Sequence, residues 1–150
     1  MTSTKLTIVL FGSLFILASL LMSQTTKPAA AAGQNKGGFQ ASMDRGKQVY
    51  LEQCLACHQV DAAGVPSMNP PLIKTKWVLG DKKTLVQLVL KGMTGDVDVN
   101  GDTYRNIMAP HSDLTDQQIA DVLTYVRNSF GNKAKAITAA EVKAIRAQTK

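Results

Sequence analysis

Cys54-Leu55-Ala56-Cys57-His58 is the stretch of sequence that decides the fold of this chain. It contains both cysteines of the chain and one of its two histidines. The order C-x-x-C-H is that of a c-type haem attachment site, in which each thiol adds across a haem vinyl group to form a thioether. The adjacent histidine then lies under the iron as an axial ligand. The stretch therefore predicts one covalently bound haem c.

Three alternative kinds of site fit the motif less well. A thioredoxin-like redox pair lacks the following histidine and lies in a strand–helix–strand setting, whereas a helix end followed by a polar loop is expected here. A zinc site needs four ligands, and only His111 is left to complete the set. A disulfide between Cys54 and Cys57 would close a tight, strained loop with little entropic gain.

The first residues have the features of an export segment. An apolar run without charges extends from Leu6 to Met22 and follows Lys5. It is slightly long for a secretory signal and slightly short for a transmembrane helix. Residues 1–23 are therefore either a signal peptide or an N-terminal membrane anchor formed by residues 6–22, and residues 24–41 are expected to be a flexible linker. Either alternative places the domain in the periplasm, because covalent c-type haem is assembled outside the bacterial cytoplasm.

The distribution of charge argues against nucleic acid as a partner. The chain has 150 residues and a formal net charge of +6. Three lysines precede residue 37 and the tail over 132–150 carries a net +4, so the part between them has a net charge of −1. A nucleic-acid footprint needs a basic face on the folded domain. The basic tail leaves docking on an acidic partner open.

The predicted first helix runs from about residue 43 to about residue 55 and has one apolar face. The residues at helical spacing on that face are Met43, Tyr50, Leu51 and Cys54. Gly46 lies on the same face, where glycine costs about 1 kcal/mol relative to alanine. This cost indicates a packing reason, such as the close approach of another helix.

A loop, a second helix and a hairpin follow. Residues 59–76 are expected to be loop because Gly and Pro punctuate them. Asp81 is suited to cap a helix that runs to about Leu90 and stops at Gly92. Between residues 95 and 104, valines alternate with aspartates around Asn100-Gly101, which predicts a small β-hairpin.

Two capping boxes mark the last helices. Thr115 and Gln118 begin a helix that has one continuous apolar face. Gly131 follows the end of this helix. That face consists of Ile119, Val122, Leu123, Val126 and Phe130. Thr138 and Glu141 begin a short helix to about Ala147 within a basic C-terminal extension, residues 132–150. A helix of this length must dock on the domain to be stable.

The second axial ligand decides between classes of function. A methionine opposite His58 suits electron transfer, whereas an open site suits ligand binding or catalysis. The candidates in the domain are Met43, Met68, Met93, Met108 and His111. Position in the chain disfavours Met43 and Met68. It favours Met108 over Met93 only modestly, because Met108 lies in a loop that leads into the capped helix.

From about Met43 to Gly131 the chain resembles the class I cytochromes c. The matching pieces are Gly46 and Tyr50 before the motif, Pro70-Pro71-Leu72, Met108-Ala109-Pro110, and Leu123-Thr124-Tyr125-Val126. In that family the axial methionine lies shortly before the last main helix, which implies Met108. A proline carbonyl accepts a hydrogen bond from the ligand histidine, and the spacing to Leu72 implies Pro70 in this role. Gly46 resembles the small residue where the first and last helices cross, with Tyr125 as its partner.

The resemblance thus implies a mostly α, class I cytochrome c-like fold around one haem, with the cytochrome domain over 42–131. A small β-hairpin and an extra short C-terminal helix complete it. The expected haem-binding residues are Cys54, Cys57, His58, Pro70, Leu72 and Met108, with His58 and Met108 on the iron. Trp77 is expected to be either a contact of a haem propionate or a buried aromatic residue. His111 is expected to be a surface residue near the ligand or a residue that contacts an iron ligand, and not a ligand itself.

Residues 77–81 and the hairpin resemble the small cytochrome domains that accompany periplasmic dehydrogenases and copper nitrite reductases. This resemblance implies a carrier of single electrons, not itself an enzyme. Its expected partners are a periplasmic dehydrogenase, a nitrite reductase or a terminal oxidase. The alternatives are an electron-relay subunit of a larger oxidoreductase complex, or a five-coordinate haem enzyme or sensor.

Overall fold

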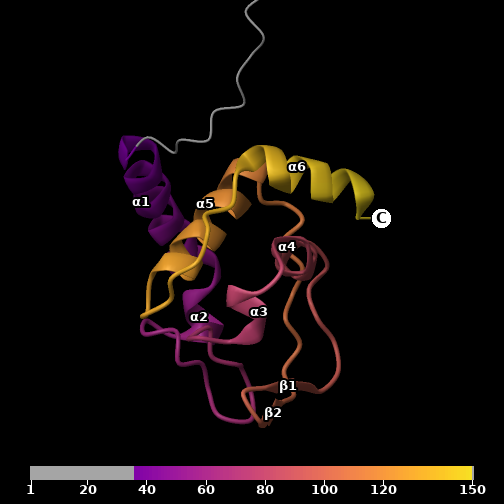
Figure 1. Ribbon diagram of the computed structural model, residues 1–150. Helices are drawn as coiled ribbons and strands as arrows, with labels where there is room; N and C mark the ends of the chain where they lie inside the picture. Colours follow the sequence, from indigo (N-terminus) through magenta and orange to yellow (C-terminus); the bar gives the residue numbers. More distant parts are fainter. Residues whose placement is uncertain (1–35, 150) are drawn as a thin grey trace, which may run out of the picture. The chain divides into compact units, whose positions relative to one another are not determined.

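The computed structural model describes residues 36–149, so the predicted signal or anchor and the linker up to residue 35 lie outside the described residues. The described chain contains six helices and one antiparallel two-stranded sheet (Figure 1). The helices are α1 (Lys36–Gln53), α2 (Leu55–His58), α3 (Lys76–Leu79), α4 (Lys82–Lys91), α5 (Asp116–Asn128) and α6 (Ala139–Gln148). The strands are β1 (Val97–Val99) and β2 (Asp102–Tyr104). Between residues 36 and 149, no helix is both long and apolar enough to cross a membrane.

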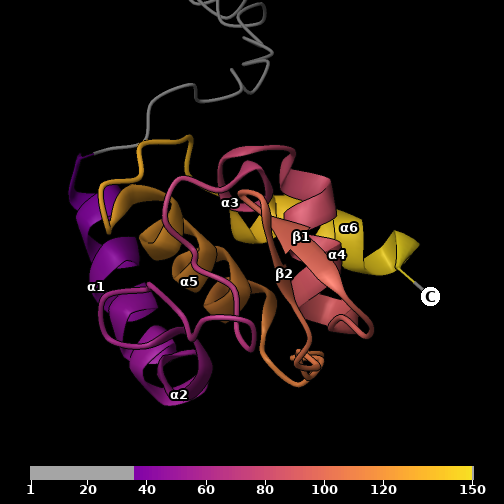
Figure 2. The same ribbon diagram turned by 90° about the horizontal axis from the view of Figure 1, so that it is seen from below.

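Helix α5 lies at the centre of the arrangement. In both views it runs between α1 on one side and α4 with α6 on the other (Figures 1 and 2). The Thr115–Gln118 capping box is present at its start, as the sequence predicts. The start of α6 likewise has the predicted Thr138–Glu141 box, and this helix packs on α5 and α4. Both helix starts that the sequence marks most clearly are therefore confirmed.

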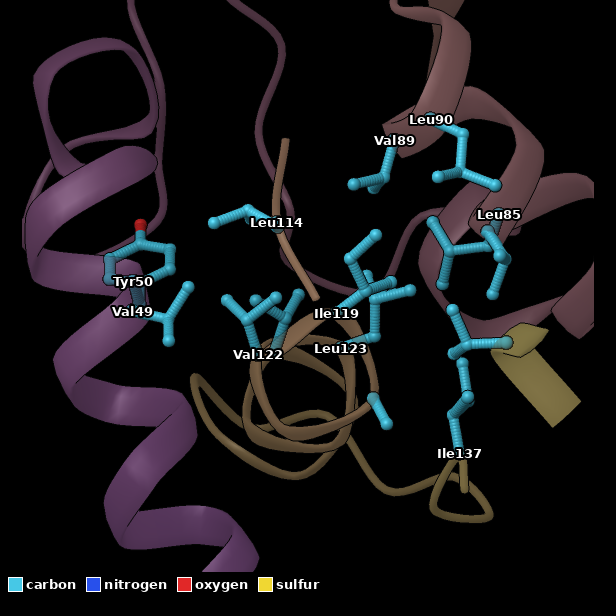
Figure 3. Close-up of a cluster of buried hydrophobic side chains, with 14 of the residues drawn as sticks. Val49, Tyr50, Leu85, Val89, Leu90, Leu114, Ile119, Val122, Leu123 and Ile137 are labelled. Carbon is cyan, nitrogen blue, oxygen red and sulfur yellow. The ribbon is translucent and has the colours of Figure 1, made fainter. Parts of the chain in front are cut away.

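The core forms where α1, α4 and the C-terminal extension pack around α5. Val49 of α1 lies beside Val122 of α5, whereas Ile119 points toward Leu85 of α4 (Figure 3). The same buried cluster includes Ile137 and Val142 of the C-terminal extension. The extension therefore docks by burying apolar side chains, as its short helix requires.

Gly46 marks the crossing of α1 and α5. A Cβ atom at this position would overlap the backbone oxygen of Asp121 and lie 2.8 Å from the Cβ of Tyr125. The predicted packing reason for this glycine is confirmed. Beside the crossing, the buried carboxylate of Asp121 accepts hydrogen bonds from Ser42 Oγ at 2.6 Å and from Arg45 Nε at 2.6 Å.

Helix α1 differs from its prediction in length and in one buried residue. It begins at Lys36, so residues 36–41 are helical and do not belong to a flexible linker. The i, i+4 hydrogen bond from Gln40 to Asp44, 2.9 Å long, supports this early turn. Gly46 and Tyr50 are buried on the face that the sequence predicts, but Val49 is buried beside them in place of Leu51, which is 39% exposed.

The other differences concern short-range geometry. Helix α5 ends at Asn128, so Phe130 is not part of it; its φ of +55° places it in the left-handed region. The ring of Phe130 still packs on Tyr50 and Tyr125, with ring centroids 5.3 and 5.5 Å apart. Near the end of the expected loop over 59–76, Thr75 caps the short helix α3, which the sequence did not predict.

The predicted β-hairpin is confirmed. Val97 pairs with Tyr104 and Val99 pairs with Asp102. The two turn residues, Asn100 and Gly101, have φ values of +56° and +97°, as a type I′ turn requires. In Figure 1 the hairpin lies at the end of the domain away from α6.

We expect Gly46→Ala to lower the free energy of unfolding by about 3 kcal/mol, because the added methyl group must push α1 away from α5. Gly38→Ala is the matched control in the same helix, since nothing lies within 4 Å of its Cβ position. Removing that glycine should raise stability by about 0.5–1 kcal/mol. Chemical denaturation of the two purified proteins measures both changes, and equal effects would contradict the close crossing.

Candidate functional site

The C-x-x-C-H stretch forms a tight turn at the end of α1. Cys54 follows the last residue of α1, and its N–H donates to the carbonyl of Tyr50 at 2.9 Å. The N–H of His58 in turn donates to the carbonyl of Cys54 at 2.9 Å. Cys54 is half-buried and Cys57 is exposed. The motif is therefore held by helical hydrogen bonds, with one thiol inside and the other at the surface.

A largely apolar cavity lies against this motif. All six sequence-predicted site residues line it, namely Cys54, Cys57, His58, Pro70, Leu72 and Met108. The remaining wall comes mainly from aliphatic side chains of α4, α5 and the β-hairpin. A flat, apolar prosthetic group is suited to such a wall, because burial of its surface is favourable.

His58 is buried and oriented by the loop that follows it. Its Nδ1 lies 2.9 Å from the carbonyl oxygen of Pro70, which can only accept, so Nδ1 carries the proton. Burial lowers the pKa of His58, the Pro70 hydrogen bond opposes this, and His111 lowers it further. The imidazole is thus kept neutral with Nε2 as its lone-pair nitrogen, the form in which histidine binds a metal.

The loop after His58 is fixed by contacts to α1 and to itself. The hydroxyl of Tyr50 donates to the carbonyl of Gln59 at 2.6 Å, and burial raises the pKa of this hydroxyl. Leu72 N–H donates to the carbonyl of Ala62 at 2.8 Å, which closes the loop. These contacts return the chain to His58 and place the Pro70 carbonyl beside it.

The raised pKa of one thiol argues against a metal thiolate at this site. Burial, with a smaller contribution from Cys57, raises the pKa of Cys54 to about 11. A buried thiol that resists ionisation is a poor metal ligand, since the thiolate is the form that binds. Within residues 36–149, no group of three or more His, Cys, Asp or Glu side chains is placed to hold a metal ion.

The structure reduces the methionine candidates to two. Met93 and Met108 both line the cavity, whereas Met43 and Met68 do not, and Met68 is 48% exposed. The backbones of Met93 and Met108 exchange two hydrogen bonds of 2.9 Å. A Cβ at Gly92, whose φ is +71°, would overlap the Met108 carbonyl oxygen, so the end of α4 packs tightly on this loop.

Trp77 carries the one buried side-chain polar atom within residues 36–149 that has no hydrogen-bond partner, its Nε1. The residue lines the cavity. An unpaired buried N–H costs about 1–3 kcal/mol, so its position indicates that an acceptor occupies the cavity when the protein is complete. The cavity thus presents two thiols, a neutral imidazole, two methionine side chains and this N–H. Together these groups fit a haem with its carboxylates.

Asn132 is a site residue that the sequence does not reveal. It is buried, and its side chain donates to the carbonyl of Leu72 at 2.9 Å and accepts from the N–H of Lys74 at 2.8 Å. It thereby fixes the segment that carries Leu72. Its position in a basic tail gives no signal of this role, because the partners lie about sixty residues away.

Comparison with known proteins agrees with this geometry. Residues 43–130 match the family model described as Cytochrome c. The chain is 32% identical over 121 residues to cytochrome c-552 of Thermus thermophilus, covering 75% of this chain and 81% of that protein. It is 35% identical over 107 residues to a gluconate 2-dehydrogenase cytochrome c subunit of Pantoea cypripedii, covering 67% of this chain and 24% of that subunit.

A third relative is the Cbb3-type cytochrome c oxidase subunit CcoP of Azospirillum brasilense. It is 35% identical over 100 residues, which cover 62% of this chain and 30% of that subunit. The family match spans more than half of the chain, and the helical fold is the one that the resemblance to class I cytochromes c implies. The chain therefore belongs to the class I cytochrome c family and is an electron-transfer protein that carries covalently bound haem c.

Proposed function

We propose that Cys54 and Cys57 attach the haem, that His58 and Met108 ligate its iron, and that the domain carries single electrons between periplasmic redox proteins. The observation that carries this proposal is the common cavity. One apolar space is lined by both thiols, by the oriented imidazole and by the Met108 side chain. These residues come from separate parts of the chain and supply every bond that the group needs.

The bound group supplies one-electron exchange at iron, and the protein residues control the conditions. The Pro70 carbonyl holds the His58 ring in one tautomer, which raises the basicity of Nε2. A methionine thioether opposite histidine raises the reduction potential. The aliphatic wall keeps water out of the site, and no residue has to gain or lose a proton.

Met108 is preferred over Met93 because of its place in the chain. It lies in the loop directly before the last main helix, α5, where class I cytochromes c carry the axial methionine. Its backbone is held on one side by Met93 and packed against Gly92. Met93 then holds the backbone of Met108 in place through the two backbone hydrogen bonds, which do not depend on the Met93 side chain.

We expect the oxidised holoprotein to show the weak near-infrared absorption band of methionine–iron ligation. Met108→Ala should abolish the band, because no other methionine lies in the loop that joins Met108 to the start of α5, which we call the ligand loop. Met93→Ala, which shortens the neighbouring cavity-lining methionine in the same way, should retain it. Loss of the band only in the Met93 variant would assign that residue instead. A wild-type protein without the band would favour the five-coordinate enzyme or sensor.

We further propose that Trp77 Nε1 donates a hydrogen bond to a haem carboxylate. The support is its buried, unpartnered state at the cavity wall. A hydrogen bond to a carboxylate favours the charged form, so it lowers the pKa of that carboxyl group. Trp77 would then act on the electrostatics of the site as well as on its packing.

Trp77→Phe should therefore raise the pKa of a haem carboxylate, seen as an upward shift in the pH dependence of the reduction potential. The shift should be about one to two pH units, since a hydrogen bond to a charged group contributes about 1.5–3 kcal/mol. Potentiometric titration of wild type and variant over a range of pH measures it. A variant that only loses stability, with an unchanged pH profile, would mean that Trp77 is a packing residue.

The contact with partners is proposed at the open side of the cavity. Cys57 is exposed there, and Met68 and Ile107 are exposed apolar residues, 48% and 70% accessible. Asn106 joins their loops, because its N–H donates to the Met68 carbonyl at 3.0 Å and its side chain donates to Asn69 at 3.1 Å. A small apolar contact of this kind suits a transient redox encounter.

Two modes of action differ in whether the protein leaves its partner. The chain aligns with most of the length of cytochrome c-552 and with about a quarter of the dehydrogenase subunit, so relatives of both kinds contain a domain similar to it. The proposed partners are a periplasmic dehydrogenase, a nitrite reductase or a terminal oxidase. Export by the apolar segment over residues 6–22, cleaved or retained as an anchor, would bring the domain to them.

We expect the protein to fractionate with the periplasm or the outer face of the inner membrane, and to separate from its partners during purification. At about 1 M salt, charge interactions are screened beyond about 3 Å, and the proposed apolar contact is too small to hold a complex alone, so a carrier should elute alone on size exclusion. Detergent-solubilised membranes analysed at low and high salt provide the comparison. A complex that persists at high salt would favour the relay subunit.

A further inference from the structure

The C-terminal helix contacts the far end of the ligand loop through one side chain. The Arg146 guanidinium donates from Nη1 to the carbonyl of Ser112 at 2.9 Å and from Nη2 to that of Leu114 at 2.6 Å. Its Nε donates to Asp116 Oδ1 at 2.7 Å. One guanidinium thus binds two residues of the loop between Met108 and α5 and the first residue of α5, although it lies 30 to 34 positions away in the sequence.

The near end of the same loop is anchored from α4. Met108 exchanges its backbone hydrogen bonds with Met93, and the N–H of His111 donates to the carbonyl of Val89 at 2.9 Å. The loop is therefore held at two places, on one side by the backbone at the end of α4 and on the other by Arg146. Of the two anchors, the second depends on a single side chain.

Arginine is well suited to this contact. Its planar, permanently charged fork binds several oxygens at once, and a bond from a charged donor is stronger than a neutral one. The Arg146 and Asp116 side chains are only 31% and 28% exposed, so water screens their pairing incompletely. Leu114, whose carbonyl Arg146 binds, is buried and lines the haem cavity. The Arg146 contact therefore reaches a residue of the cavity wall.

We propose that Arg146 is a positioning residue for the axial methionine: by holding Ser112, Leu114 and Asp116, it sets how readily the Met108 thioether leaves the iron. This inference rests on the proposed ligation by Met108. It gives the C-terminal extension a role in the redox site, although no residue of α6 is among those that line the haem cavity. A loosened loop would let outside ligands reach the iron and would lower the potential, because the methionine raises it.

Binding of added imidazole to the oxidised holoprotein tests the proposal, because imidazole can occupy the iron only after Met108 has left. Arg146→Gln should increase the limiting rate of imidazole binding about tenfold or more, since it removes a set of charge-assisted hydrogen bonds. It should also lower the reduction potential. Stopped-flow absorbance and potentiometry provide the two measurements.

Lys82→Gln is the matched control. Lys82 Nζ lies 2.8 Å from Glu141 Oε1, so this pair also ties α6 to the domain, but through α4 and away from the ligand loop. The control should leave the imidazole rate within about twofold of wild type and the potential unchanged within error, because the Lys82–Glu141 pair is similarly exposed but contacts no residue of the ligand loop. Equal effects of the two variants, or no effect of Arg146→Gln, would overturn the proposal.

Arg146→Lys keeps the charge but cannot form the fork, and it remains informative if the glutamine variant does not fold. It should give an intermediate rate, because lysine reaches one or two of the three oxygens at a time. A wild-type rate in this variant would show that charge alone suffices and would overturn the positioning role of the fork. Absence of the near-infrared band in wild type would instead contradict Met108 ligation itself, so the two failures are distinct.

Discussion

Helix α5 is buried over most of its surface, so each of its buried polar side chains needs a partner inside the protein. Asp121 binds Ser42 and Arg45 of α1. Thr124 Oγ1 donates to the carbonyl of Ile137 at 3.1 Å and accepts from its N–H at 3.0 Å. An unpaired polar group at any of these positions would cost about 1–3 kcal/mol. The need for pairing therefore fixes α1 and the tail around one helix.

Arg127 extends this constraint to the cavity. Burial lowers its pKa, and the guanidinium is compensated by backbone oxygens: Nη1 donates to Val78 at 2.6 Å and to Gly80 at 3.2 Å. It thereby holds α3, whose Trp77 lines the cavity. The attachment motif is in turn held by α1, and the ligand loop by the start of α5. Both halves of the haem site thus take their positions from residues that contact the same central helix.

Local signals in the sequence predicted the parts of the fold that depend on neighbouring residues. The two capping boxes, the Asn100-Gly101 turn and the cap at Asp81 all involve groups a few positions apart, and the structure contains each of them. The buried polar residues of α5 could not be found in this way. Asp121, Thr124 and Arg127 recur at spacings of three, which is the pattern of a solvent-exposed face, and the partners named above lie 13 to 79 positions away. Burial that depends on distant segments leaves no periodic signal.

The burial of the C-terminal extension could not be predicted from its composition either. Its composition indicates solvated charge, and Lys133 and Lys143 are indeed exposed. Yet Val142 of α6 is fully buried, and Ile137, just before the helix, is nearly so, because the extension turns its few apolar residues toward the rest of the domain. Net charge describes only the outward face of such a helix. The inward face decides whether the extension is an appendage or part of the domain, and here it completes the burial of the helix on which both halves of the site depend.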